Sequence, residues 1–244
     1  MSTAPDISLH SLTADLPRVG GRKSELVYTA LKRAILFRQL VPDQQLLEQE
    51  LAAVFGCSQG TIREALLRLA DDGLVRRLGY RGTRVTETSL EEAVEMVRVR
   101  LTIERGVARK IAVAEMGPHR ERMDALLARM AQAHAQDDLF LGAELDREFH
   151  CALASAAEMD LLRPVLLRCT LHIHRFTLSS IEVPRQYYQE AGVDAEHQAL
   201  FEALTCGDPD RAERVISEHI AHVLERWAPS VYDAIGPSLF ASLR

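Results

Sequence analysis

The stretch from Leu47 to Val85 reads LEQELAAVFGCSQGTIREALLRLADDGLVRRLGYRGTRV, and it decides the fold of the first part of the chain. Apolar residues follow helical spacing on both sides of a break at Gly56. They are Leu47, Leu51 and Val54 before the break and Ile62, Leu66 and Leu69 after it. Glycine can take the left-handed conformation that ends a helix, and Ser58 is a favourable N-cap for the next one. This pattern predicts a helix-turn-helix.

A small basic hairpin is predicted directly after the second helix. Gly73 ends that helix, Leu74–Leu78 and Thr83–Val85 read as short strands, and glycines occupy the turn between them. The hairpin carries Arg76, Arg77, Arg81 and Arg84, which could meet phosphates or a minor groove. A helix-turn-helix followed by such a hairpin is a winged helix. The alternative is a small helical domain with a solvated basic hairpin.

Arg63 is the residue that we expect to read DNA sequence. It lies near the start of the second helix, whose first turn meets base edges in the major groove, and an arginine there can bind guanine with two hydrogen bonds. Ser58, Gln59 and Thr61 offer further hydrogen bonds from the same turn. The alternative for Arg63 is a surface ion pair with Glu64 or Glu50.

The remaining sequence predicts a helical bundle. The chain has 244 residues with 5% aromatic residues and abundant Ala and Leu, which favours a mainly α protein. The predicted helices are 24–37 before the helix-turn-helix, and then 90–116, 119–136, 139–156, 161–179, 193–206 and 209–228. The predicted organisation is a mobile arm (1–21), a winged helix-turn-helix domain (22–86), a linker (87–90), an all-helical effector-binding and dimerisation domain (91–229) and a C-terminal tail (230–244).

Charge and cysteine content limit the partners and the compartment. Residues 22–88 hold 11 Lys and Arg against 8 Asp and Glu, a net charge of +3, whereas residues 89–244 hold 17 against 25, a net charge of −8. A basic N-terminal domain on an acidic protein fits DNA contact at one end. No apolar run approaches about 18 residues, no secretory signal is present, and the four cysteines are scattered. We therefore expect a reduced, cytoplasmic location and no membrane partner.

A second constellation lies in the predicted bundle. Asp146 and His150 are four residues apart and share one helical face, while His197 and His219 lie on two other helices. Three imidazoles and a carboxylate from three helices can bind a divalent transition metal and leave a position open for a ligand. Zinc is the leading candidate, with nickel and manganese also compatible. The alternative is that these are ordinary core or surface histidines.

The N-terminal residues resemble the DNA-binding domain of GntR-type transcriptional regulators. The resemblance runs from about Leu26 to Val85, and its most specific part is Ile62–Leu66 followed by Gly73–Val75. The chain departs from the family at Arg38–Asp43, at Leu47, and at Gln49 and Gln59, where basic residues are usual. The last two departures concern which DNA sequence is read. The complete expected DNA-binding set is Arg63, Ser58, Gln59, Thr61, Gln49, Arg68, Arg81, Gly82 and Arg84.

The C-terminal residues resemble the FCD domain of the FadR-like subgroup of these regulators, over about Leu90 to Trp227. The segments that carry it are DREFHCAL (146–153), EHQALFEAL (196–204) and EHI (218–220). The resemblance implies that Asp146, His150, His197 and His219 are metal ligands, and that the effector is a small acid rather than a fatty acyl group. It also implies that Arg100 contacts the effector carboxylate. An exposed Arg100–Glu104 pair is the alternative.

Two function classes follow. The first is a ligand-responsive transcription regulator, of the repressor kind, in which a small organic acid shifts the placement of the paired DNA-binding heads of a homodimer on an operator with two half-sites. The second is a metallohydrolase built on the Asp/His cluster. Against the enzyme, no carboxylate is placed by motif as a general base, because Glu148 and Glu196 are expected to point to other helix faces. We therefore predict a regulator and no catalytic residues.

Overall fold

The computed structural model describes residues 22–179, 193–236 and 238–241. The chain divides into two compact units between Thr88 and Ser89, and each is described by itself. The arm predicted over residues 1–21 lies outside the described residues. Within the described part of the chain, no helix is both long and apolar enough to cross a bilayer.

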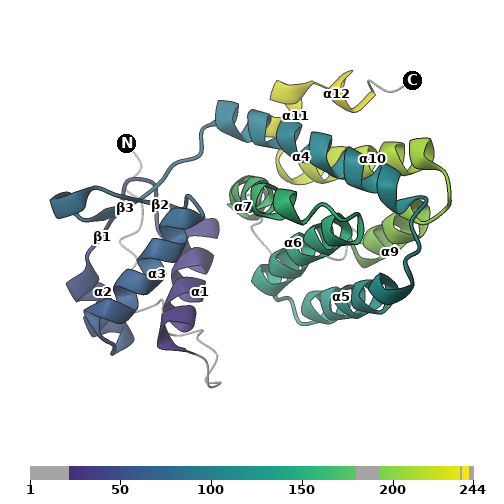
Figure 1. Ribbon diagram of the computed structural model, residues 1–244. Coiled ribbons are helices and arrows are strands. Elements are labelled where there is room, and N and C mark those ends of the chain that lie inside the picture. The colour runs from purple at the N-terminus through teal and green to yellow at the C-terminus, as the bar shows by residue number, and fades with distance from the viewer. Residues whose placement is uncertain (1–21, 180–192, 237, 242–244) are drawn as a thin grey trace. The chain divides into compact units, whose positions relative to one another are not determined.

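The first unit is a winged helix-turn-helix, as predicted. It contains helices α1 (Lys23–Leu36), α2 (Glu48–Phe55) and α3 (Gln59–Asp71) and strands β1 (Gln45–Leu46), β2 (Val75–Arg77) and β3 (Thr83–Val85) (Figure 1). The strands form one antiparallel sheet in the order β1-β3-β2. In the hairpin, Arg77 of β2 is paired with Thr83 of β3. On the other side of β3, Arg84 is paired with Gln45 of β1.

The local signals of the helix-turn-helix have the expected geometry. Gly56 ends α2 in the left-handed conformation, with φ of 56°. The Ser58 side chain accepts a hydrogen bond from the Thr61 backbone N–H at the start of α3. Both Gly79 and Gly82 have positive φ in the wing, where a short 3-10 turn (Gly79–Arg81) joins the strands. The helix end at Gly56, the N-cap at Ser58 and the glycines of the wing turn therefore have the conformations that the sequence predicts.

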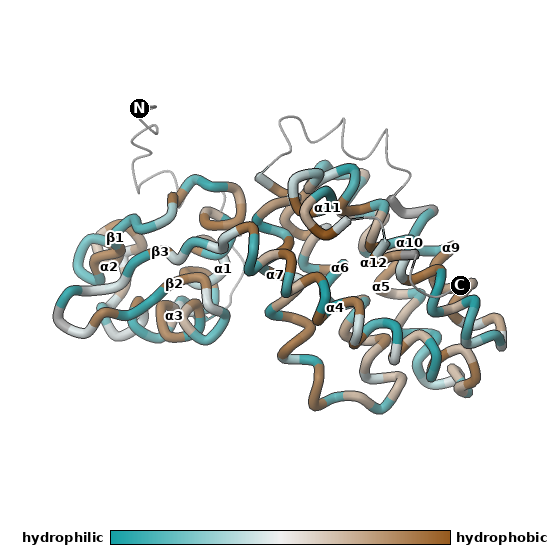
Figure 2. Tube along the Cα trace, turned by 90° about the horizontal axis from the view of Figure 1, so that it is seen from above, coloured by the Kyte–Doolittle hydropathy of each residue, from teal (hydrophilic) through white to brown (hydrophobic). Residues whose placement is uncertain are grey.

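The core of this unit lies between α1, α3 and the sheet. Its side chains include Leu31, Leu51, Ile62, Leu66 and Leu74, all essentially inaccessible to solvent. Figure 2 shows hydrophobic and hydrophilic residues interleaved along α1 and α3, as expected for helices that bury one face.

Leu47 differs from the prediction that it would face the core. It is 38% exposed, and Leu46 is buried instead. Leu47 has extended backbone angles at the N-cap of α2, and Leu46 belongs to β1, a strand that the sequence did not reveal. Because successive side chains of a strand point to opposite faces, burying Leu46 turns Leu47 outward.

The second unit is the predicted helical bundle. Its longer helices are α4 (Leu90–Ile111), α5 (Gly117–Ala135), α6 (Leu139–Ala156), α7 (Arg163–Ser179), α9 (Val193–Leu204) and α10 (Pro209–Trp227). Ser89 caps α4 in a capping box with Glu92, and Asp208 caps α10 with Pro209 in its first turn. Ser and Asp are favoured N-cap residues, so both caps follow from the local sequence.

The bundle differs from the prediction at two helix ends. Helix α4 ends at Ile111 and not at Met116, because Pro118 belongs to the first turn of α5 and does not mark the end of α4.

The expected tail from residue 230 contains two short helices, α11 (Pro229–Ile235) and α12 (Ser238–Ala241). Val231 and Ile235 are buried there, and Arg105 of α4 donates a hydrogen bond to the Leu239 carbonyl (2.9 Å). This segment is therefore part of the packed bundle.

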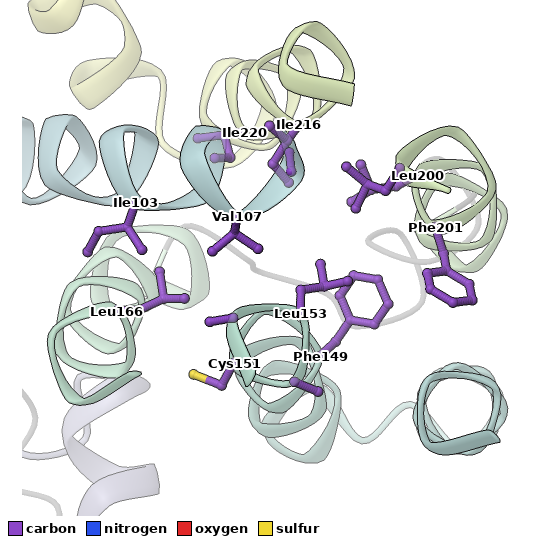
Figure 3. Packing of buried hydrophobic residues seen from close by; sticks show 14 of the residues in the cluster. Ile103, Val107, Phe149, Cys151, Leu153, Leu166, Leu200, Phe201, Ile216 and Ile220 are labelled. Atoms are coloured by element: carbon purple, nitrogen blue, oxygen red, sulfur yellow. The ribbon is translucent and has the colours of Figure 1, made fainter. Parts of the chain in front are cut away.

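Side chains from several helices meet at the centre of the bundle core. Figure 3 shows Phe149, Cys151 and Leu153 of α6 pointing toward side chains of α4, α7, α9 and α10. Phe149 and Phe201 are fully buried at this junction. Since the same α6, α9 and α10 carry the four expected metal ligands, this core determines where those ligands stand.

Candidate metal centre and nucleic-acid interface

The four expected metal ligands are brought together. Asp146 and His150 come from α6, His197 from α9 and His219 from α10. One possible ligand atom from each lies within 4.8 Å of the others, and the three histidines are buried. Asp146 Oδ1 lies 3.0 Å from His197 Nε2 and 3.6 Å from His150 Nε2.

This donor set fits a divalent transition metal. Nitrogen and oxygen ligands of zinc stand at about 2.0–2.2 Å from the ion, so two ligand atoms of one ion are at most about 4.4 Å apart. The largest separation of 4.8 Å in the cluster is therefore close to that of two ligand atoms on opposite sides of one ion. Three imidazoles and one carboxylate form a mixed nitrogen and oxygen set suited to zinc, nickel or manganese.

Electrostatics keeps the carboxylate ionised and one imidazole neutral. Burial alone would raise the pKa of Asp146, but hydrogen bonds and charge from His150, His174 and His197 hold it well below its usual value. Burial lowers the pKa of His219 far below its usual value, and the nearby His197 and His150 add to this. An ionised Asp146 and a neutral His219 are the forms that bind a metal.

His150 is held from behind by a buried carboxylate. Glu104 of α4 lies 2.5 Å from His150 Nδ1, which leaves Nε2 directed at the cluster. Burial opposes the charged form of His150, but the Glu104 carboxylate outweighs it and the pKa is raised to about 9. A metal-binding histidine commonly gives its second nitrogen to such a carboxylate, which orients the ring. No sequence motif signals this contact between Glu104 and His150.

Arg100 forms the pair with Glu104 that was one of the two predicted alternatives, and its contact with an effector stays a prediction. It pairs with Glu104 one helical turn later, with Nε 2.5 Å from Oε1, but the pair is inside the bundle and not on an exposed face. Its Nη2 lies 3.1 Å from His150 Nε2. The guanidinium is therefore next to the metal ligands, where an anion bound to a metal would also lie.

A cavity opens from the cluster. Its volume is about 60 Å³. It is lined by Arg100 and by three of the four cluster residues, Asp146, His197 and His219. A buried water needs about 10–15 Å³ of such space, so the cavity has room for roughly four to six atoms of water size. Its lining is mixed, with both apolar and polar side chains. The apolar lining includes Met130, Leu139, Ile173 and Leu178; the further lining includes His134, His174, His222, Arg226 and Trp227.

Further histidines lie near the cluster or in the core of the bundle. His174 of α7 lies 3.2 Å from Asp146 Oδ2, and no motif signals this contact. His222, one turn after His219, lines the cavity, and His134 lines it too. His172 is buried on α7. Only packing of α7 and α5 against α6 reveals which of these histidines face the cluster.

The two glutamates next to ligands in sequence have different positions. Glu148 faces Arg122 and Arg129 of α5, with N–O distances of 3.8 and 3.9 Å. This agrees with the expectation that it points away from the ligands. Glu196 is exposed, and it is also among the residues that line the cavity.

The first turn of α3 presents the expected DNA-reading residues to solvent. Ser58, Gln59 and Arg63 are exposed and Thr61 is half-buried, while Ile62 and Leu66 face the core. Arg63 donates from Nε and Nη2 to the two carboxylate oxygens of Glu48, at 3.1 and 2.7 Å. The predicted alternative of an ion pair is therefore present, but its partner is Glu48 of α2 and neither Glu64 nor Glu50.

A groove lies between α2, α3 and the wing. Glu48, Arg63, Arg77 and Gly82 are among its lining residues. Gln49 and Arg81 are exposed near it in sequence. Arg84 donates to the Asp43 backbone carbonyl at 2.6 Å, and Arg76 pairs with the Asp43 carboxylate at 2.8 Å. One aspartate therefore restrains two of the four wing arginines.

Arg68 does not lie with the other expected DNA contacts. Its guanidinium pairs with Glu25 and stacks over the Tyr28 ring, 4.0 Å from the centroid, both on α1. Arg68 is one residue more than a helical turn from Arg63, so it leaves the exposed face of α3 and meets α1 instead. Its role is to join α3 to α1.

Comparisons with known proteins agree with both units. The family model for bacterial regulatory proteins of the gntR family matches residues 23–85, and the FCD domain model matches residues 95–222. The HTH-type transcriptional repressor RspR of Escherichia coli (strain K12) is 27% identical over 208 residues, which are 83% of this chain and 87% of that protein. The probable D-xylose utilization operon transcriptional repressor of Paenarthrobacter nicotinovorans is 31% identical over 188 residues, 75% of this chain and 79% of that protein.

The fold is shared with solved regulators. The Escherichia coli McbR/YncC structure matches 89% of this chain and 100% of its own, with a TM-score of 0.62 and 20% identity. A GntR regulator structure from Rhodococcus sp. RHA1 matches 84% of this chain and 99% of its own, with a TM-score of 0.60 and 22% identity. With both family models matched in order along it, the chain belongs to the GntR family of bacterial regulatory proteins, carries an FCD domain, and is a DNA-binding transcription regulator and not an enzyme.

Proposed function

We propose that the protein is a cytoplasmic, homodimeric repressor whose helical unit binds one divalent metal ion and a small carboxylic acid, and whose DNA affinity depends on that acid. The observation that carries the proposal is the convergence of Asp146, His150, His197 and His219 beside Arg100 on one small cavity. The two relatives described above are named as repressors, which supports the direction of regulation.

The cavity supports a small anionic effector. A metal held by four protein ligands in an octahedral arrangement keeps open positions that an oxygen of the acid can fill. Arg100 is buried beside them and remains cationic, and a guanidinium is the group that binds a carboxylate with two hydrogen bonds. The volume of about 60 Å³ favours an acid of a few heavy atoms over a fatty acyl chain.

The metal is tested by elemental analysis of the purified protein. We expect about one zinc, nickel or manganese per chain, and a loss of most of it in His197→Ala, because a ligand is removed. His222→Ala is the matched control, since His222 lines the same cavity one turn from His219 but is outside the ligand cluster. Full occupancy in His197→Ala would contradict the ligand assignment.

The effector is tested through the single tryptophan of the chain. Trp227 lines the cavity, so its fluorescence reports events there and not in the winged helix. Small carboxylic acids are titrated into metal-loaded protein, and we expect a saturable change for a subset of them. Arg100→Lys keeps the charge beside Glu104 but loses the forked donor, so the affinity should fall at least tenfold while metal content is unchanged. Equal affinity in this variant would remove Arg100 from the acid site.

DNA reading is tested on sites selected by the protein from random duplexes. Arg63→Ala should abolish discrimination between the selected site and random DNA, because a base-edge contact from α3 is lost. Arg68→Ala is the matched control, since Arg68 is on the same helix but packs on α1. Unchanged anisotropy-based affinities for both DNAs in Arg63→Ala would refute its role.

The dimer and its paired half-sites are tested together. Paired heads related by two-fold symmetry should select a site with two similar halves, and two chains should bind per site. Inserting about 5 base pairs between the halves turns one of them to the opposite side of the duplex, so the affinity should fall sharply. A single half-site bound by one chain in analytical ultracentrifugation would contradict the dimer.

A further inference from the structure

We propose that His174 is a positioning residue for the metal centre: it holds the Asp146 carboxylate by Oδ2, so that Oδ1 alone faces the three ligand histidines. The proposal rests on the metal site proposed above and adds a residue outside its four ligands. His174 belongs to α7, which contributes no ligand, and it is buried against α6.

The two oxygens of Asp146 have separate partners. Oδ1 faces His197 Nε2 at 3.0 Å and His150 Nε2 at 3.6 Å, whereas Oδ2 faces His174 Nε2 at 3.2 Å. A carboxylate held in this way offers a metal one oxygen and not both. The second oxygen is already engaged with a residue on the far side of the cluster.

Arg147 determines how the hydrogen of His174 is placed. Its Nη1 lies 3.1 Å from His174 Nδ1, and it also pairs with Glu144 one turn earlier on α6. A guanidinium can only donate, so Nδ1 must accept and Nε2 must carry the hydrogen. Nε2–H then donates to Asp146 Oδ2. The chain Glu144–Arg147–His174–Asp146 is therefore a directed set of hydrogen bonds that ends at the expected ligand.

This arrangement separates a positioning role from direct ligation. A metal ligand must offer a nitrogen lone pair, but Nε2 of His174 carries hydrogen and Nδ1 faces Arg147. His174 therefore acts through Asp146. Residues that hold metal ligands in this way commonly change metal affinity by about 10–100-fold when replaced.

Two substitutions at one position test the proposal. His174→Gln reaches as far as Nε2 and can both donate to Asp146 and accept from Arg147. His174→Asn reaches only as far as Nδ1, so it keeps an acceptor for Arg147 and loses the donor to Asp146. Both retain a buried polar amide, which makes them a matched pair.

The measurement is the affinity for Co²⁺ in chelator-treated full-length protein, followed by the visible absorption of the bound ion. We expect His174→Asn to bind about 10–100-fold more weakly than the unchanged protein, and His174→Gln to bind within about threefold with the same spectrum. The melting temperatures of the two variants without metal should agree, which excludes a general loss of folding.

The outcomes are distinct. His174→Asn binding Co²⁺ as tightly as the unchanged protein overturns the positioning role. Loss of affinity with an altered spectrum in His174→Gln as well overturns it in favour of direct ligation. Failure of the unchanged protein to bind Co²⁺ removes the metal site itself, and this role with it. If His174→Asn does not fold, Arg147→Met tests the same chain: the His174 ring loses the hydrogen bond at Nδ1 that fixes its orientation, and the affinity should fall at least threefold.

Discussion

At the scale of single residues, Glu48 binds Arg63, the proposed DNA-reading residue, in a contact that the sequence did not indicate. Its carboxylate accepts hydrogen bonds from Nε and Nη2 of Arg63, so Nη1 can still donate to DNA. Because a long arginine side chain otherwise samples many rotamers, this contact orients the group before DNA arrives. The hydrogen bond from Arg63, together with its charge, lowers the pKa of Glu48, so the pair stays ionised in neutral solution.

Replacing Glu48 therefore separates orientation from charge. In Glu48→Ala, we expect affinity for random DNA to stay equal or rise, because a negative charge leaves the binding face. The ratio of selected-site to random-DNA affinity should fall at least threefold, because Arg63 is no longer restrained. Anisotropy titrations at one fixed salt concentration measure both values. Glu64→Ala on the exposed face of α3 is the control, and an unchanged ratio in Glu48→Ala would mean that the pair has no orienting effect.

At the scale of elements, the start of α4 depends on its capping box. The Ser89 side chain accepts from the Glu92 N–H at 3.1 Å, and Glu92 accepts from the Ser89 N–H at 2.9 Å. These contacts satisfy backbone donors that the first turn of a helix leaves without partners. Helix α4 also carries Arg100 and Glu104, so the cap stabilises the helix that supports His150.

Ser89→Ala should lower the free energy of unfolding of the helical unit by about 1 kcal/mol, because an N-cap hydrogen bond is lost. Urea unfolding followed by Trp227 fluorescence measures this in the full chain, since the winged helix has no tryptophan. Ser89→Asp, which keeps an acceptor at the N-cap, should retain most of the stability. A midpoint for Ser89→Ala equal to that of the unchanged protein would show that α4 begins without this cap.

At the scale of the whole molecule, the metal is expected to join three helices that are distant in sequence. Asp146 and His150 lie on α6, His197 on α9 and His219 on α10. A ligand that binds only the folded chain stabilises it by about 2.7 kcal/mol at a concentration 100-fold above its dissociation constant. Metal should therefore stabilise the helical unit in particular.

Chelator treatment should lower the melting temperature of the helical unit by several degrees, and added Zn²⁺ should restore it. Trp227 fluorescence follows the helical unit during heating. His197→Ala should melt at the same temperature with chelator and with Zn²⁺. A shift of equal size in that variant would place the stabilising metal elsewhere.

The sequence by itself determined most of the elements and singled out the four residues proposed as metal ligands. Helical spacing, the left-handed Gly56, the Ser58, Ser89 and Asp208 caps and the wing glycines act through neighbours within a few residues, so they can be read without a structure. The four cluster residues were identified from spacing and from the resemblance to a family. Strand β1 and the last two helices escaped this reading, because each is stabilised by contacts with distant segments and has little local signal.

Tertiary structure alone decided which side chains meet. Glu104 faces His150 across 46 residues, and His174 faces Asp146 from a helix that carries no ligand motif. Arg63 pairs with Glu48 and not with Glu50 or Glu64, and Arg68 pairs with Glu25 of α1. These partners depend on how helices pack and rotate against one another, and sequence spacing specifies only the faces of a single helix.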